Sequence, residues 1–217
     1  MDIADKDVYE YMMNFADNRT LLNMLSVNKQ FRDENFFRKV MERRYPLLIE
    51  YRKEGETWRH FFIRMVFYLS ELWEKYQIPY IPTKGCSPES LLYRKIRITE
   101  NEIYNDALLC AASGNQLQIA KYLIEEKGAT DLFNSFDWAS RYGSIEVMEY
   151  LYQKSAEHPV GSRQVDLGTA IVNAIAKEQI SSIDFLRKKG YIVKQRDIRF
   201  AEKDGHGNIA NYLKQFI

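Results

Sequence analysis

Small and apolar residues recur in a fixed register along the second half of the chain. Four small residues set the register, and they are Ala111, Ala139, Ala174 and Ala201. Eleven residues after each one begins an apolar pair: Tyr122-Leu123, Tyr150-Leu151, Phe185-Leu186 and Tyr212-Leu213. An apolar residue also stands three positions before each small residue: Leu108, Phe136, Ile171 and Ile198. A self-similar period of about 30 residues indicates a stacked helical solenoid, which is a fold that presents a surface for binding.

Each period predicts two helices joined by a short turn. The small residue lies in the first helix, where its short side chain lets a neighbouring helix approach closely. Glycine and asparagine in the turns tolerate the left-handed backbone that such turns often require. Gly128 and Gly190 stand where the second helices are expected to end. Because one helix pair buries too little apolar surface to offset its ordering entropy, several pairs must stack into a continuous core.

The first half of the chain also follows helical spacing, but without a repeat. Apolar residues in 1–46 recur every three or four positions, which predicts short helices with one apolar stripe. Residues 57–76 predict one strongly apolar helix beginning near Thr57, and the prolines and glycine of 78–88 predict a linker. We therefore expect an all-α chain in three parts, with boundaries at 1–46, 47–100 and 101–217.

Composition narrows the classes of function. Lys and Arg number 31 against 30 for Asp and Glu, so the chain lacks the basic excess typical of nucleic-acid or membrane binding. Neither a secretory signal nor a membrane-spanning apolar run is apparent, which predicts an intracellular protein, cytoplasmic or nuclear. The two cysteines and three histidines show no metal-ligand spacing, and no phosphate loop or nucleophile motif occurs. We expect no metal, no cofactor and no enzymatic activity.

Residues 101–217 resemble ankyrin repeats, about four in number and degenerate. The family pattern has an alanine pair, two variable residues, Gly-His and then an aliphatic helix. Ala111-Ala112 followed by Asn115-Gln116 matches this pattern with Asn-Gln in place of Gly-His, and Gly205-His206 matches it fully. The family's Thr-Pro-Leu-His opening is absent from every unit. Repeats this degenerate are of the kind found in poxviruses and giant DNA viruses.

The ankyrin resemblance implies a target-binding protein and gives roles to particular residues. In the family, the residues after the alanine pair point into the groove that holds the target. The residues expected there are Arg141, Tyr142, Lys177, Lys203 and Asp204. The imidazole of His206 is expected to join adjacent repeats by a hydrogen bond. The identity of the target protein is left open by the sequence.

The segment Leu21-Leu22-Asn23-Met24-Leu25-Ser26-Val27-Asn28-Lys29-Gln30-Phe31 resembles an F-box. Ile3 and Ala4 stand where that family has Leu and Pro. The resemblance implies that apolar side chains of 1–46 dock onto the Skp-type adaptor of a cullin ubiquitin ligase. The residues expected to do so are Ile3, Val8, Tyr11, Met12, Leu21, Leu22, Leu25 and Val27.

Together the two resemblances imply an adaptor that recruits a target to a ubiquitin ligase, in the host cytoplasm if the chain is viral. An alternative stays open on the residues alone. In that alternative the N-terminal helices only cap the repeat stack, and the chain is a non-enzymatic binding protein that sequesters a host or cellular factor.

Overall fold

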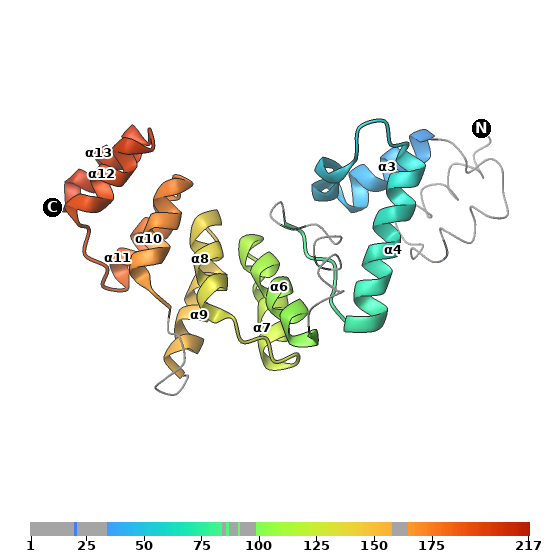
Figure 1. The fold of residues 1–217 in the computed structure, drawn as a ribbon, viewed down its shortest axis with the longest axis horizontal. Coiled ribbons are helices and arrows are strands. Elements are labelled where there is room, and N and C mark those ends of the chain that lie inside the picture. Colours follow the sequence, from blue (N-terminus) through green and yellow to red (C-terminus); the bar gives the residue numbers. More distant parts are fainter. Residues whose placement is uncertain (1–19, 21–33, 84–85, 87–90, 92–98, 158–164) are drawn as a thin grey trace. The chain divides into compact units, whose positions relative to one another are not determined.

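The computed structural model describes residues 20, 34–83, 86, 91, 99–157 and 165–217. Every regular element in these ranges is a helix, so the all-α prediction is confirmed (Figure 1). The chain divides into two compact units, Met1–Ile96 and Arg97–Ile217, which we call unit 1 and unit 2. Within the described ranges, none of the helices combines the length and the apolar character that a membrane span requires.

Unit 1 is built on a long helix whose start is visible in the sequence. Its helices are α3 (Glu34–Arg44), the 3-10 helix η2 (Pro46–Tyr51) and α4 (Trp58–Tyr76). The hydroxyl of Thr57 caps α4 by accepting a hydrogen bond from the His60 amide at 3.2 Å. The helix predicted over 57–76 is therefore confirmed, and residues 78–83 beyond it are non-helical, as their prolines predict.

The core of unit 1 is rich in aromatic side chains. α3 contributes Phe36, Phe37, Val40 and Met41, which confirms that the apolar stripe predicted there faces inward. Leu48 of η2 joins them, and α4 contributes Phe61, Phe62, Met65, Val66 and Leu69. The rings of Phe37 and Phe62 lie 5.5 Å apart and link the two helices. One core therefore holds together residues from both sides of position 46.

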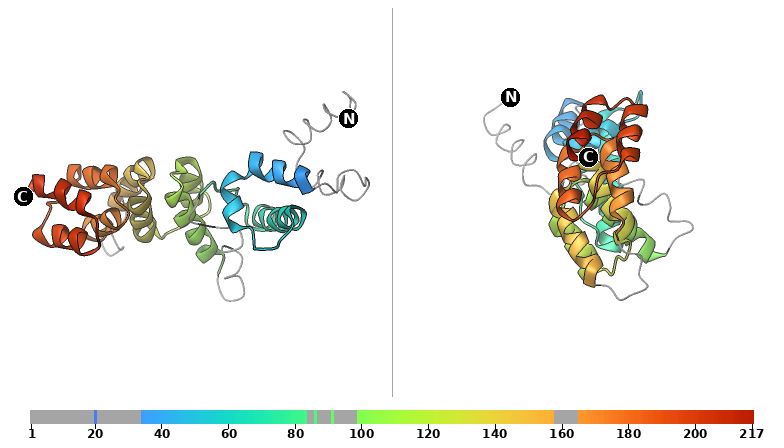
Figure 2. Two further views of the ribbon diagram at one scale, coloured as in Figure 1. Left: turned by 90° about the horizontal axis from the view of Figure 1, so that it is seen from above. Right: turned by 90° about the vertical axis from the view of Figure 1, so that its left-hand side faces the viewer.

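Unit 2 consists, in its described residues, of four consecutive helix pairs (Figures 1 and 2). The pairs are α6 (Glu100–Ser113) with α7 (Leu117–Glu125), α8 (Leu132–Tyr142) with α9 (Ile145–Glu157), α10 (Leu167–Ala176) with α11 (Ile180–Lys188), and α12 (Gln195–Lys203) with α13 (Gly207–Leu213). The 3-10 helix η4 (Lys214–Phe216) follows. The first helices pack against one another in the order α6, α8, α10, α12, and the second helices α7, α9, α11 pack in the same order. The first three pairs thus pack through both of their helices, and the fourth packs on the third through α12, with a hydrogen bond from the Tyr212 hydroxyl of α13 to Asp184 of α11.

Most of the residues that recur at fixed spacing in the sequence are buried residues of unit 2. The four small residues Ala111, Ala139, Ala174 and Ala201 are fully buried in the first helices. The leucines of the apolar pairs are fully buried in the second helices: Leu123, Leu151, Leu186 and Leu213. The apolar residues three positions before the small ones are also buried: Leu108, Phe136, Ile171 and Ile198. Short side chains therefore occur where helices cross closely, and long ones fill the space between the pairs.

Each first helix ends in the same hydrogen-bonded turn. The carbonyl of the small residue accepts a hydrogen bond from the amide five residues later, at 2.9, 2.9, 2.9 and 2.8 Å in the four pairs. The residue four positions after the small one has a positive φ in every case: Asn115, Gly143, Glu178 and Gly205. This combination is the Schellman motif, which satisfies carbonyls left open at a helix end. Gly128 and Gly190 also have positive φ and follow α7 and α11, where helix ends were expected.

Candidate protein-binding surface

The four turns between paired helices lie side by side along one edge of unit 2. We call this set the turn row and define it as residues 113–116, 141–144, 176–179 and 203–206, which occupy equivalent positions in the four pairs. The Ser144 hydroxyl donates to the Ser113 carbonyl at 3.4 Å, joining the second turn to the first. His206 Nδ1 lies 2.7 Å from Glu178 Oε1, joining the fourth to the third, so the expected tie from His206 between neighbouring pairs is present.

The second and third turns are in van der Waals contact. A Cβ placed on Gly143 would lie 2.5 Å from Oε1 of Gln179, so the absence of a side chain at Gly143 allows this approach. The Gln179 side chain is held in turn by its own hydrogen bond to the Lys177 carbonyl at 2.8 Å. The turn row is therefore linked without interruption from the first pair to the fourth, and its geometry is set before any partner arrives.

The turn row contains all five side chains that were predicted to contact a target. Lys177, Lys203 and Asp204 are exposed, and Tyr142 is 38% exposed. The ring of Tyr142 packs against that of Trp138 one turn earlier in α8, with centroids 5.8 Å apart. This support from Trp138 was not predicted, because an aromatic residue in a helix is more often part of the core.

Arg141 differs from its neighbours in the turn row because it is half-buried. Its Nε atom is buried and makes no hydrogen bond within the described residues. Arg141 is partly exposed and lies beside the exposed ring of Tyr142 in the turn row.

An open cavity of about 880 Å³ lies at the other end of the first helices, between α10 and α12. Its lining comes from residues 166–169 and 172 near the start of α10, from the connection 190–194, and from Arg196, Asp197 and Phe200 of α12. This cavity was not predicted from the sequence. Its walls come from three segments that approach one another only in the folded chain, and the repeat pattern says nothing of the connections between pairs.

The acidic groups of this cavity are held by the protein itself. Asp166 caps α10: its carboxylate accepts from the Gly168 amide and from the Thr169 hydroxyl, each at 2.8 Å, and these bonds lower the pKa of Asp166. Asp197 is buried and accepts from the Tyr191 hydroxyl and the Lys194 amide, each at 2.8 Å. Burial, followed by the hydrogen bond to Asp197, raises the pKa of Tyr191 to about 12, so this phenol stays a donor at neutral pH.

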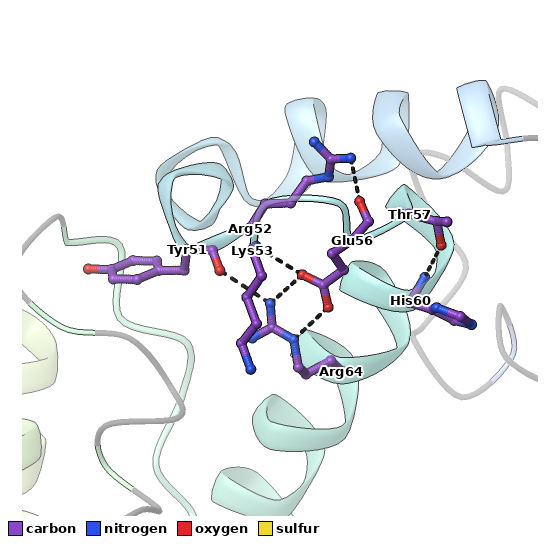
Figure 3. Close-up of polar contacts among 7 residues, drawn as sticks. All are labelled: Tyr51, Arg52, Lys53, Glu56, Thr57, His60 and Arg64. Carbon is purple, nitrogen blue, oxygen red and sulfur yellow. Dashed lines mark hydrogen bonds and ion pairs between the residues drawn. The ribbon is translucent and has the colours of Figure 1, made fainter.

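Unit 1 holds a different polar cluster, at the start of α4. Figure 3 shows the Arg64 guanidinium bonded to both carboxylate oxygens of Glu56, at 2.8 and 2.6 Å, and to the Tyr51 carbonyl at 3.2 Å. Glu56 also accepts from the amide of Lys53 at 3.1 Å. Hydrogen bonding to Arg64 lowers the pKa of Glu56 by favouring its charged form. Because these groups bond to one another, the cluster holds the loop before α4 in place.

The predicted ligase-contacting residues lie outside the described residues. They are Ile3, Val8, Tyr11, Met12, Leu21, Leu22, Leu25 and Val27. Within the described ranges, no group of three or more His, Cys, Asp or Glu side chains is placed to hold a metal ion. Comparisons with protein-family models, with curated proteins and with solved structures find no match to this chain.

Proposed function

We propose that this chain is a protein-interaction adaptor in which unit 2 is a degenerate ankyrin-repeat solenoid that holds a target protein. The observation that carries the proposal is the fourfold repeat of one turn geometry, which sets exposed side chains in a linked row. A row held by its own hydrogen bonds loses little conformational entropy on binding, and this pre-organisation favours affinity. The surface offers the residue types that dominate binding hot spots, namely the arginine and tyrosine at positions 141 and 142.

The second half of the proposal concerns the N-terminal segment. Its support is the F-box resemblance of residues 21–31. Docked on a Skp-type adaptor, the chain would bring the bound target close to the ubiquitin-conjugating enzyme. The gain in transfer rate would come from effective concentration, so the chain itself would need no catalytic group.

The target half of the proposal is tested with the double variant Arg141→Ala/Tyr142→Ala. Proteins that co-purify with the full chain from cell lysate are quantified by mass spectrometry for the wild type and the variant. The matched control is Gln118→Ala/Lys188→Ala, which changes two exposed residues of the second helices. We expect at least one partner to be lost about tenfold or more by the first variant and retained by the control. Equal partner profiles for a folded variant and the wild type would exclude the turn row as the binding surface.

The ligase half is tested with Leu21→Asp/Leu22→Asp and a purified Skp-type adaptor. The control is Phe67→Asp/Trp73→Asp, which places the same charges on two exposed apolar residues of α4. We expect the wild type and the control to co-purify with the adaptor, and the first variant to fail. If the wild type itself fails while target capture through the turn row persists, the alternative of a sequestering protein with a helical cap is the better account.

A further inference from the structure

We propose that the cavity between α10 and α12 receives an apolar side chain from an acidic segment of the target protein. This inference rests on the proposed function, since it names the kind of segment that unit 2 would hold. The cavity is lined by the first two turns of α10, whereas the turn row begins where α10 ends. A target that spans this helix would therefore meet two separate contact points.

The cavity has an apolar wall that solvent reaches. Leu167 and Val172 of α10 face it together with Phe200 of α12 and Ile192 of the connection. The side chain of Ile192 is 76% exposed, which leaves one of the largest apolar surfaces of unit 2 uncovered. The volume is within the range of small-ligand sites, but the cavity is open along one side. This shape suits one side chain of an extended peptide better than an enclosed small molecule.

The charges around this wall select for an acidic occupant. Asp166 and Asp197 already accept hydrogen bonds from protein donors, so neither presents a free carboxylate to an incoming cation. Lys194 is exposed at the rim, and the Arg196 side chain, whose Nε lies 3.6 Å from Asp197 Oδ1, is nevertheless 65% exposed, so both cationic side chains remain open to solvent. A carboxylate of the target placed beside the apolar side chain would lie within reach of both cationic groups.

The second half of unit 2 also carries more basic than acidic side chains. Residues 165–217 carry nine basic and six acidic side chains, whereas residues 100–157 carry four basic and ten acidic ones. On α12, the exposed side chains Arg196, Arg199 and Lys203 stand three and four positions apart, so they form one basic stripe. Lys203 belongs to the turn row, and this stripe therefore connects the cavity to it. An acidic segment that follows this stripe meets three basic side chains of α12 between the two contact points.

The test uses the full chain and a fluorescein-labelled peptide in which one leucine is flanked on both sides by glutamates. Two further probes replace the leucine by serine or the glutamates by lysines. Fluorescence anisotropy should show saturable binding of the first peptide only, and this binding should weaken as salt is added. We expect Arg196→Gln to weaken it about fivefold, Ile192→Ser to weaken it similarly, and Arg196→Lys to retain most of it.

The matched control is Lys188→Gln, which removes one exposed charge from α11, away from the cavity. If Lys188→Gln weakens binding as much as Arg196→Gln, only the net charge of unit 2 matters and the cavity proposal is overturned. Equal binding of the lysine peptide, or no saturable binding of the glutamate peptide, also overturns it. Any of these three results would overturn the cavity proposal alone. The proposed function would still stand if partner capture depends on Arg141 and Tyr142, so failure of the cavity proposal can be told apart from failure of the proposed function.

Discussion

Units 1 and 2 bury apolar side chains in different ways. In unit 1, ten buried side chains from α3, η2 and α4 form a single cluster, and four of them are the phenylalanines Phe36, Phe37, Phe61 and Phe62. An irregular loop is fastened to this cluster by the ion pair between Arg64 and Glu56. In unit 2, the same burial pattern recurs in four helix pairs, and the described helices of each pair pack on those of the next pair in the row.

This difference in packing shows how much of each unit's structure is specified by residues close together in the sequence. A repeat unit is specified by a short local pattern, and an error in one pair is felt mainly by its neighbours. A cluster built from separate elements depends on every element at once, and its ion pair joins positions eight residues apart across a loop and a helix. Substitutions in the two units should therefore differ in how far their effects spread.

The largest effect is expected for Leu151→Ala in α9. Leu151 is fully buried in an internal pair, so its truncation should lower the free energy of unfolding by roughly 2–5 kcal/mol. Leu213→Ala makes the same change in the fourth pair, which within the described residues packs on the third pair alone, and should lose less. Urea titration of both variants measures the difference, and equal losses would argue against stability that is set by neighbouring pairs.

In unit 1, Arg64→Met should lower the free energy of unfolding by about 3 kcal/mol, because it leaves the Glu56 carboxylate without its partner. The side chains are only 16% and 12% exposed, so water replaces little of the lost interaction. The double variant Arg64→Met/Glu56→Met should recover most of the loss, since no charge then remains buried. Denaturant titration compares them, and a double variant as unstable as the single one would show that the pair is not the cause.

The same ion pair predicts a pH dependence. Because the pKa of Glu56 is lowered in the folded chain, its stabilising contribution is complete above the unfolded value of about 4.3. That contribution is lost as the pH falls through the lower folded value. Thermal unfolding of wild type and Glu56→Gln should therefore differ at pH 7 and converge in acid. The control Glu54→Gln, at an exposed position of the same loop, should parallel the wild type throughout.

Smaller effects are expected in the turn row. Gly205→Ala should lower the free energy of unfolding by about 1 kcal/mol, because its φ of 83° disfavours any residue with a Cβ. Space is available there, whereas a Cβ at Gly143 would also meet the Gln179 side chain, so Gly143→Ala should cost more. Thermal unfolding measures the loss of stability in each variant. A larger loss for Gly205→Ala than for Gly143→Ala would show that the second and third turns do not touch in solution.

The smallest effect is expected for Glu178→Gly. Glu178 adopts φ of 53° at the position that glycine occupies in two other turns, so glycine should relieve backbone strain. The gain in stability from relieving this strain is reduced by the larger conformational entropy that glycine gives the unfolded chain. It is reduced further by loss of the Glu178 contact with His206. We expect a change of less than about 1 kcal/mol, measured beside Glu178→Gln, which keeps the strain and a polar side chain. A large loss in Glu178→Gly alone would show that strain at this turn is negligible.

Much of the architecture follows from local patterns in this chain. The helix over 57–76 was predicted from its apolar run and the threonine before it, and the glycines that end α7 and α11 from their position after such runs. The constant eleven-residue step from Ala111, Ala139, Ala174 and Ala201 to their apolar pairs predicted both the helix pairs and the buried residues. The five predicted target contacts fall in one row for the same reason, because equivalent positions of a repeat must lie side by side when its units stack.

What the amino-acid sequence determined is therefore the set of features that depend on neighbours along the chain: helix starts, helix ends, turn conformations and the buried face of each helix. Only the tertiary structure decided which distant groups meet. It placed Arg64 on Glu56, left Arg141 Nε buried and unbonded within the described residues, and opened the cavity between α10 and α12. The physical reason is the range of the interactions. Periodicity and capping act within a few residues, whereas a cavity or a long-range ion pair depends on how completed helices pack, and a single sequence does not display that packing.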